Sequence, residues 1–442
     1  MPPRRIYTGA IATTSNPTIF LSAGEASGDH YGAQIITEFS GRHPGATFFG
    51  LGGREMESAG QQRIVRAEDV AHMGITEVLR HAPRVYGSYR RLVASIKQRR
   101  PQAAVLIDFP DVNLRLAREL KALNIPVVYF VSPQLWAWKR RRLRWVQQRV
   151  DRMMVIFPFE ETFYRSRHVN ATFTGHPLAE LPCPTISREQ FAVTYMSANR
   201  EDPQSSSHMS RRWIALLPGS RRKEVESNLP TMLEAAAVLG PDYDFLIPVA
   251  STVDIGWVSN FVFQEILPRL HWPKSSITLV PDAREALHHA QASIVASGTA
   301  TVQAAVIGNP FVVVYKVSPL TFKLAKRLVH YPPEVWSSTA PDAGLDSHGN
   351  LPIAMVNLIA GRRIVPELLQ DNFTAANVAQ ALRPLLDDTP QRSQMIADLA
   401  GLRQSLLPQA GASSIAQVAD AVDSLLPQPT VTTGGRISSA SV

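Results

Sequence analysis

Short runs of apolar residues alternate along the chain with longer stretches in which apolar residues recur at helical spacing. In the first half the apolar runs predict strands at Thr18–Ser22, Thr47–Leu51, Ala103–Ile107, Val127–Val131 and Arg152–Ile156. Helical patterns fill the gaps between them, as in Tyr31–Phe39, Arg84–Lys97 and Leu114–Leu123. Continuously apolar strands that alternate with helices are typical of a parallel sheet covered on both faces.

The second half repeats this order of elements. Its predicted strands are Ile214–Leu217, Phe245–Pro248, Ile277–Leu279, Ala292–Ala296 and Phe311–Tyr315. We therefore expect an α/β protein with two Rossmann-like domains that face a cleft, because ligands of such sheets bind beyond the carboxyl ends of the strands. The expected division is a first domain at 1–185, a linker at 186–212, a second domain at 213–426 and a disordered tail at 427–442.

Composition narrows the class of protein. The 442 residues include 45 Lys and Arg against 37 Asp and Glu, which gives a net charge of +8. This balance favours anionic partners such as nucleic acid, nucleotide phosphates or acidic lipid. The single cysteine, Cys183, excludes an intramolecular disulfide and a cysteine-cluster metal site. The sequence predicts no membrane-spanning helix, because no apolar run reaches about 18 residues. It predicts no secretory signal, because the polar residues 13–16 interrupt the stretch that follows Arg4 and Arg5.

Two motifs follow predicted strands of the first half. Gly24 and Gly28 bracket the start of a helix, where backbone amides attract an anion or a polar sugar group. The alternative is a tight turn capped by Ser27 or Asp29. Asp108 ends the strand at 103–107, where a carboxylate could accept a proton from a hydroxyl. Equally, Asp108 could serve only to form the turn. Asp111 and Asn113 could cap the next helix, and capping is the better interpretation for Asp111.

Two further motifs follow strands of the second half. Gly219, Ser220 and Arg221 form a glycine turn before a helix, and we expect the turn amides and the guanidinium to hold a diphosphate. Small residues also begin the helix after the strand at 292–296. They are Ser297, Gly298 and Thr299. Two such helix starts converging on one anion are more plausible than either alone, but ordinary tight turns explain the same pattern.

Two surface patterns combine apolar and basic residues. Trp136 and Trp138 precede the basic run 139–142. The indoles could stack on sugars or lipids, and the combination with cations also suits nucleic acid. The alternative is a solvated basic face with one tryptophan in the core. Val78, Leu79, Val85 and Tyr86 lie among cations, which suits an anchor at an anionic membrane or an ordinary amphipathic helix. No spacing in the sequence requires a metal.

Together the motifs resemble those of the bacterial lipid-A-disaccharide synthases. The shared segments are SAGEASGD (22–29), MGITEVL (73–79), IDFPDVN (107–113), VSPQLWAW (131–138), FPFEETFY (157–164), TGHPLAE (174–180), LLPGSRRKEVE (216–226), ASGTATVQ (296–303), FKLAKRLV (322–329) and NLIAGRRIVPELLQ (357–370). They cover roughly 17–385 in the same order.

The resemblance implies an inverting, metal-independent glycosyltransferase of GT-B architecture without a cofactor. It implies that 2,3-diacylglucosamine passes from its UDP donor to 2,3-diacylglucosamine 1-phosphate, giving the β-1,6-linked lipid A disaccharide 1-phosphate and UDP. The second domain is then expected to bind UDP. The first is expected to bind the acceptor and acidic lipids, as a cytoplasmic protein peripheral on the inner face of the inner membrane. No nucleic-acid partner is implied.

The resemblance also implies a role for individual residues. Asp108 is expected to be the general base for the acceptor 6-hydroxyl. The donor set is Gly219, Ser220, Arg221, Ser297, Gly298, Thr299, Gln303 and Asn357. The acceptor set is Glu25, Ser27, Asp29, Gln134 and Trp136, and the membrane set is Val78, Leu79, Val85 and Tyr86.

The chain departs from the family pattern at two places in the donor set. Gln303 stands where the family usually has a glutamate that is expected to hold the ribose hydroxyls. The segment Met355–Asn357 replaces a Leu-Pro-Asn sequence. Two other functions stay open at this point, namely another UDP-N-acetylglucosamine transferase or epimerase, and a basic RNA- or membrane-binding protein.

Overall fold

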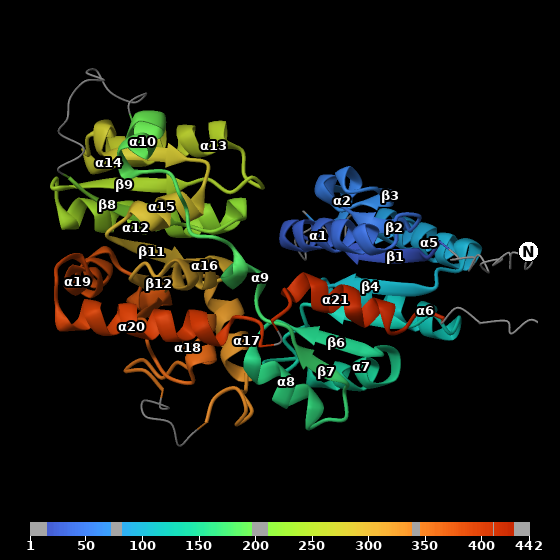
Figure 1. The fold of residues 1–442 in the computed structure, drawn as a ribbon. Coiled ribbons are helices and arrows are strands. Elements are labelled where there is room, and N and C mark those ends of the chain that lie inside the picture. Colours follow the sequence, from blue (N-terminus) through green and yellow to red (C-terminus); the bar gives the residue numbers. More distant parts are fainter. Residues whose placement is uncertain (1–15, 72–81, 197–210, 338–344, 410, 428–442) are drawn as a thin grey trace, which may run out of the picture. The chain divides into compact units, whose positions relative to one another are not determined.

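The computed structural model describes residues 16–71, 82–196, 211–337, 345–409 and 411–427. The chain divides into two compact units. The first comprises 1–133, 144–154 and 415–442, and the second comprises 134–143 and 155–414. Figure 1 shows the elements of both.

The first parallel sheet has seven strands in the order β3-β2-β1-β4-β5-β6-β7. Their bounds are β1 Thr18–Ala23, β2 Thr47–Gly52, β3 Gln61–Arg66, β4 Ala103–Ile107, β5 Val127–Phe130, β6 Arg152–Val155 and β7 Ala171–Phe173. β1 and β4 lie side by side at the centre, with Leu21 opposite Val105. Every residue of β4 is buried, as its uninterrupted apolar sequence requires of a central parallel strand.

Helices connect these strands as the alternating pattern predicts. They are α1 Ala26–Arg42, α2 Arg54–Ser58, α3 Glu68–Ala71, α5 Ala82–Arg99, α6 Pro110–Ala122, α7 Leu143–Arg149 and α8 Pro158–Arg165. Pro110 begins α6, a position where proline's fixed φ is already helical and its missing N–H has no partner to lose.

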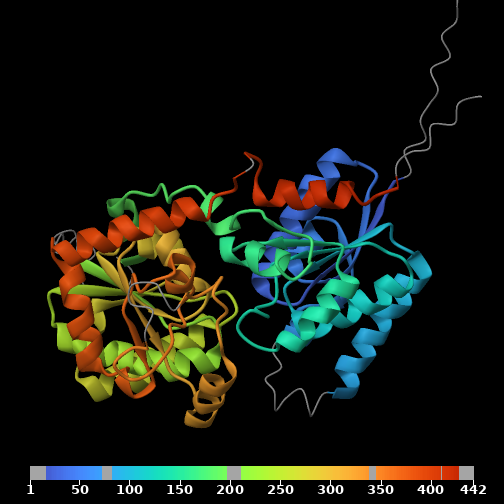
Figure 2. The ribbon, with the colours of Figure 1, turned by 90° about the horizontal axis from the view of Figure 1, so that it is seen from below.

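The second parallel sheet has six strands in the order β10-β9-β8-β11-β12-β13. Their bounds are β8 Arg212–Leu217, β9 Tyr243–Pro248, β10 Ile277–Val280, β11 Ala292–Ala296, β12 Phe311–Tyr315 and β13 Glu367–Leu369. Helices cover both faces of this sheet (Figure 2).

The α-helices of the second half are α9 Pro177–Glu180, α10 Arg188–Phe191, α12 Arg222–Leu239, α13 Ile255–Asn260, α14 Leu267–Leu270, α15 Ala283–His289, α16 Thr299–Ile307, α17 Pro319–Leu328, α18 Met355–Ala360, α19 Ala375–Leu386, α20 Pro390–Ser405 and α21 Ser414–Asp423. Short 3-10 or π turns are η1 Arg140–Arg142, η2 Ala192–Met196, η4 Phe261–Ile266, η5 Lys274–Ser276 and η6 Gln370–Asn372.

The ten predicted strands are all present, and the two-sheet α/β architecture is confirmed. Three further strands were missed by the pattern. β3 has the sequence QQRIVR, in which polar residues break the apolar run, and it forms one edge of its sheet. β7 and β13 have three residues each, too few to show a period.

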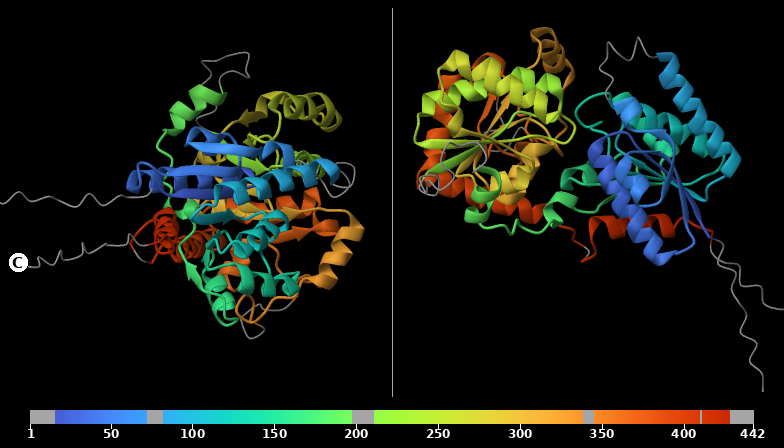
Figure 3. Two further views of the ribbon diagram at one scale, coloured as in Figure 1. Left: turned by 90° about the vertical axis from the view of Figure 1, so that its right-hand side faces the viewer. Right: turned by 90° about the horizontal axis from the view of Figure 1, so that it is seen from above.

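Each compact unit is built from separate stretches of the chain, since 134–143 belongs to the second unit and 415–442 to the first. The last helix, α21, belongs almost entirely to the first unit, where Val418, Ala419 and Val422 are buried. Figure 3 shows this helix in red. The predicted disordered tail lies outside the described residues, apart from residue 427.

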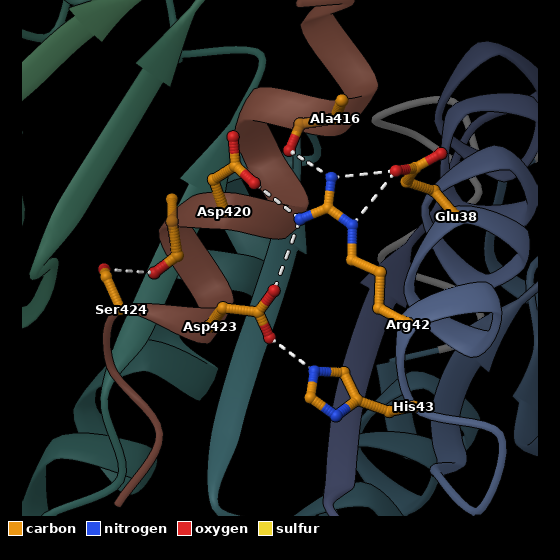
Figure 4. Close-up of polar contacts among 8 residues, drawn as sticks. Glu38, Arg42, His43, Ala416, Asp420, Asp423 and Ser424 are labelled. Carbon is orange, nitrogen blue, oxygen red and sulfur yellow. Dashed lines mark hydrogen bonds and ion pairs between the residues drawn. The ribbon is translucent and has the colours of Figure 1, made fainter. Parts of the chain in front are cut away.

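An ionic cluster fastens α21 to the end of α1 (Figure 4). The Arg42 guanidinium donates to the carboxylates of Asp420 and Asp423, and also to Glu38 on its own helix. His43 Nε2 lies 2.6 Å from Asp423 Oδ1. Hydrogen bonds to these carboxylates raise the pKa of Arg42, so the guanidinium stays charged throughout the working pH range.

Candidate functional site

The first sheet reverses its strand order between β1 and β4, and the chain leaves both strands at the same edge. β1 leads to the segment 24–28, and β4 leads directly to Asp108. Parallel α/β sheets bind ligands at such a reversal, beyond the carboxyl ends of the strands. The fold therefore brings together two motifs that are about 80 residues apart in sequence.

Asp108 is held in an uncommon backbone conformation at this edge. Its φ is +45°, and that of Phe109 is +48°, in the left-handed region that costs non-glycine residues about 1–3 kcal/mol each. The Asp108 amide donates to the Phe130 carbonyl at 2.9 Å. Its carbonyl accepts from the Tyr129 hydroxyl at 2.6 Å and from Asn113 Nδ2 at 2.8 Å. These bonds fix the main chain from which the carboxylate extends.

Asn113 is the central brace of this arrangement, a structural role that the sequence analysis missed, since it suggested only that Asn113 could cap the helix. The side chain is fully buried and accepts from Ser22 Oγ at 2.6 Å. Its amide group also approaches the carbonyls of Ser22 and Ile107. Asn113 thus ties the end of β1 to the end of β4. No local pattern could reveal partners on a strand 91 residues away.

Gly24 serves the same junction by its small size. A Cβ at Gly24 would lie 2.4 Å from the Phe109 ring, so any other residue would displace that ring and the turn that carries Asp108. Tyr31, on α1, interacts electrostatically with Asp108 at this junction. Burial and the nearby Asp108 carboxylate raise the pKa of the Tyr31 phenol to about 12. The phenol therefore stays neutral beside the carboxylate.

The other residues expected at the acceptor wall have different surroundings. Glu25 is the N-cap residue of α1 and is half-buried, and Ser27 is exposed in the first turn. Asp29 is buried. Its carboxylate accepts from the amides of Gly53, Glu55 and Met56 at 2.7–3.2 Å. Asp29 therefore caps the start of α2, and its contact with an acceptor stays a prediction.

The second sheet reverses its strand order between β8 and β11, so the turns after these strands also meet at one edge. Gly219 has φ +124°, and Ser220 and Arg221 follow it before α12. Thr252 Oγ1, from the loop after β9, donates to the Ser220 carbonyl at 2.6 Å. The expected convergence of the two helix starts on one sheet edge is therefore present.

Glu224 occupies the amides that were expected to hold a diphosphate. Its Oε2 accepts from the Ser220 amide at 3.0 Å and the Arg221 amide at 3.3 Å, and its Oε1 lies 3.4 Å from Arg221 Nη1. A Cβ at Gly219 would come within 2.5 Å of this carboxylate. Burial and the charge of Glu224 raise the pKa of Tyr315, the last residue of β12. An incoming diphosphate would have to displace Glu224 to reach these amides.

The start of α16 is open in comparison. Gly298 and Thr299 are exposed, Ser297 and Gln303 are half-buried, and the N-cap residue, Gly298, has no side chain to cap the helix. Asn357 is fully buried, and its side-chain amide forms hydrogen bonds within the protein. Nδ2 donates to Glu367 Oε1 and Val365 O, and Oδ1 accepts from two main-chain amides. Asn357 therefore holds the 353–367 segment together, and its contact with the donor stays a prediction.

The two tryptophans of the segment 134–143 differ in exposure. Trp136 is 1% exposed, and its Nε1 donates to the buried Glu160 at 3.1 Å. The expected contact of Trp136 with an acceptor stays a prediction, and the burial of its ring shows a role in the core. Trp138, by contrast, is 46% exposed, and Gln134 is exposed as well. The alternative of one tryptophan in the core is the one that the structure supports.

The membrane set lies partly beyond the described residues. Val78 and Leu79 fall in the segment 72–81, which the structure does not describe, whereas Val85 is half-buried and Tyr86 exposed on α5. Within the described ranges no helix is long and apolar enough to cross a membrane. In the same ranges no group of three or more acidic, histidine or cysteine side chains forms a metal site.

Comparison with known proteins places this geometry in a family. The sequence profile described as lipid-A-disaccharide synthetase matches residues 19–420. A lipid-A-disaccharide synthase of Acidobacterium capsulatum is 51% identical over 93% of this chain and 97% of its own.

Solved structures share the fold at low identity. The kitacinnamycin glycosyltransferase has a TM-score of 0.55 and 16% identity, covering 93% of this chain and all of its own. A UDP-GlcNAc 2-epimerase from Neisseria meningitidis has a TM-score of 0.54 and 10% identity, covering 92% and 98%. These likenesses show a GT-B-type fold alone, whereas the profile match and the 51% identity show that the chain belongs to the lipid-A-disaccharide synthase family.

Proposed function

We propose that this protein transfers 2,3-diacylglucosamine from its UDP donor to 2,3-diacylglucosamine 1-phosphate. Membership in the family supports this assignment. The single structural observation that carries it is the position of Asp108 at the strand-order reversal of the first sheet, where Asn113 and Tyr129 hold the main chain from which its carboxylate extends. A fixed base at a ligand-binding edge is what deprotonation of a sugar hydroxyl needs.

In the proposed reaction the acceptor 6-hydroxyl attacks the anomeric carbon of the donor. A carbon–oxygen bond forms as the bond to the UDP diphosphate breaks, and the hydroxyl proton passes to the Asp108 carboxylate. The electron pair of the broken bond leaves with UDP. Attack from the face opposite the leaving group inverts the anomeric carbon and gives the β-1,6 linkage.

Charge on the departing diphosphate needs stabilisation. Arg221 and the start of α16 at Ser297, Gly298 and Thr299 are the groups we propose for this role, with no metal. The Arg221 guanidinium is largely exposed and its ion pair with Glu224 is loose at 3.4 Å, so it can turn to an anion at little cost. Gly219 contributes its amide, and Ser220 contributes its own once the Glu224 carboxylate moves.

We also propose that Val85 and Tyr86 on α5, together with Val78 and Leu79, contact acidic lipids on the inner face of the inner membrane. Exposed Tyr86 and the basic residues of α5 support this assignment. Salt extraction of membranes tests this membrane contact. Protein that is found in the soluble fraction at low salt would contradict the assignment.

The experiment for the reaction is a two-substrate assay with thin-layer detection of the disaccharide and measurement of UDP. Disaccharide should form when both acylated substrates are present, and addition of EDTA should leave the rate unchanged. Asp108→Asn should lose most of the turnover while it still binds UDP, and the matched control Asp111→Asn should retain turnover. UDP release from non-acylated UDP-N-acetylglucosamine alone would instead indicate a different sugar transferase or epimerase.

A further inference from the structure

Helix α17 presents an unusual surface for a helix of a folded domain. All six residues from Lys323 to Leu328 are exposed, although they cover more than a full turn. Leu324 and Leu328 are 55% and 54% exposed, and their spacing of four places them on the same side of the helix. An ordinary surface helix buries its leucines against the core. Figure 2 shows α17 as an orange helix at the margin of the second unit.

The charges of α17 all have one sign. Lys323, Lys326 and Arg327 flank the two leucines, and the sequence 319–330 contains no acidic residue. Within the described part of the chain, neither Lys323 nor Arg327 forms an ion pair. Lys326 Nζ donates to the His348 carbonyl at a long 3.4 Å. The helix thus pairs exposed apolar side chains with cations for which the described ranges provide no carboxylate partner.

An exposed indole lies next to the end of this helix. The His330 amide donates to the Ala137 carbonyl at 3.3 Å, and Arg140 Nη2 donates to the His330 carbonyl. Both segments belong to the second unit. Trp138, between Ala137 and Arg140, is the exposed tryptophan described above, and the Lys139 ammonium lies 4.0 Å from its ring centroid. An apolar ring with adjacent cations suits a lipid–water interface.

We propose that α17 and Trp138, together the α17–Trp138 surface, dock on an anionic lipid bilayer. Leu324 and Leu328 would enter the boundary between headgroups and acyl chains, and Trp138 would lie at headgroup level. Lys323, Lys326 and Arg327 would contact lipid phosphates. This surface belongs to the second unit and is separate from the membrane set on α5, and the inference does not depend on the proposed reaction.

The charge pattern favours a bilayer over other occupants. A second copy of this chain, at net charge +8, would bring further positive charge against the cations of α17. Single-stranded RNA would use the cations and an aromatic ring but would leave the two leucines in water. A bilayer of acidic lipid satisfies the leucines, the indole and the cations together.

A single-cysteine probe tests this surface directly. In a Cys183→Ser background, Leu324→Cys is labelled with an environment-sensitive fluorophore, and Ile396→Cys, an exposed position on α20, is the matched control. On addition of phosphatidylethanolamine–phosphatidylglycerol vesicles, the label at position 324 should shift to the blue and be quenched by doxyl lipids. The label at position 396 should do neither. No change at position 324 while the protein sediments with vesicles would overturn the proposal.

A charge variant provides the second measurement. Lys323→Gln with Arg327→Gln should weaken vesicle binding by about thirtyfold, at about fivefold for each cation removed. Arg269→Gln with Lys274→Gln makes the same change of net charge elsewhere in the second unit and should have little effect. The proposal would be overturned if the two double variants lost vesicle binding equally. It would also be overturned if Lys323→Gln with Arg327→Gln lost RNA binding or dimer formation but kept its vesicle binding. Because the vesicles contain no sugar substrate, these results are independent of whether the proposed reaction occurs.

Discussion

Replacing Asn113 with alanine would remove the brace between β1 and β4 without touching the Asp108 side chain. The amide group would no longer donate to the Asp108 carbonyl, now at 2.8 Å, or to the Ile107 carbonyl at 3.1 Å. Ser22 Oγ would lose its acceptor at 2.6 Å. The substitution therefore leaves three buried polar groups short of a partner at the junction.

The magnitude follows from these bonds. A buried hydrogen bond contributes about 1 kcal/mol net, so three lost bonds lower the local free energy of opening by about 3 kcal/mol. The left-handed conformations of Asp108 and Phe109 also have to be held against about 1–3 kcal/mol of strain each. Tyr129 alone would then hold the Asp108 carbonyl. A shift of about 1 Å at a reacting group lowers turnover by about a hundredfold.

Two measurements check this expectation. Hydrogen exchange should show faster opening of the amides in β4 and α6, and turnover per folded molecule should fall by about a hundredfold while UDP binding is retained. Asn309→Ala is the matched control. Asn309 is also buried, accepts from Ser293 Oγ at 2.6 Å and donates to the Ala290 carbonyl at 2.7 Å, and it precedes β12 at the opposite end of that strand from Tyr315.

Asn309→Ala should therefore lose stability by a comparable amount without the loss of turnover. If the two alanine variants lose turnover equally, the brace has no special role in positioning Asp108. If Asn113→Ala retains full turnover, the backbone of Asp108 does not need the brace, and the reasoning is refuted.

Three other predictions concern separate parts of the chain. Burial lowers the pKa of His176 to about 3, so the folded state resists protonation; stability should be constant above the ordinary pKa of about 6.5 and fall by up to about 1.4 kcal/mol per pH unit below it. Urea unfolding across this pH range should show this fall in the free energy of unfolding for the native protein and not for His176→Asn. The same pH dependence in the variant would mean that other groups cause it. Gln303→Glu should tighten UDP binding by a few-fold at neutral pH, because an ionised acceptor binds hydroxyls more strongly than an amide, and calorimetry that shows weaker binding would remove residue 303 from the ribose contacts. Arg42→Leu should lower the free energy that holds α21 in place by about 1–3 kcal/mol and speed proteolysis between 406 and 414. The control Arg118→Leu removes an exposed ion pair with Glu119 and should change little. Equal proteolysis of the two variants would mean that apolar contacts alone hold the helix.

The apolar runs of the sequence were sufficient to predict the order of the principal strands and the α/β class. Strand order along the chain also predicted that Asp108 and the turn at 219–221 lie at carboxyl edges of sheets, because parallel strands all end at the same edge. The motifs then indicated the family, because several unusual segments occur in the same order as in its members, and the profile match confirms it. These inferences need only local pattern and the general rules of parallel sheets.

Individual polar side chains could not be assigned in this way. Asp29, Asn357 and Trp136 stand in motifs that suggest ligand contact, yet each is buried with its polar atoms engaged by the protein. The same uncertainty applied to Asn113, whose partner Ser22 is 91 residues away. A carboxylate or amide looks the same in sequence whether it faces solvent or a main-chain donor.

The sequence by itself therefore determined the architecture, the family and the edges at which chemistry can occur, because periodicity and chain order are local properties. Only the tertiary structure decided which polar residues hold the fold and which remain accessible. Glu224 closing on the turn at 219–221 and Leu324 standing exposed on α17 are examples. The physical reason is that burial and hydrogen-bond satisfaction depend on neighbours that the fold supplies from distant parts of the chain.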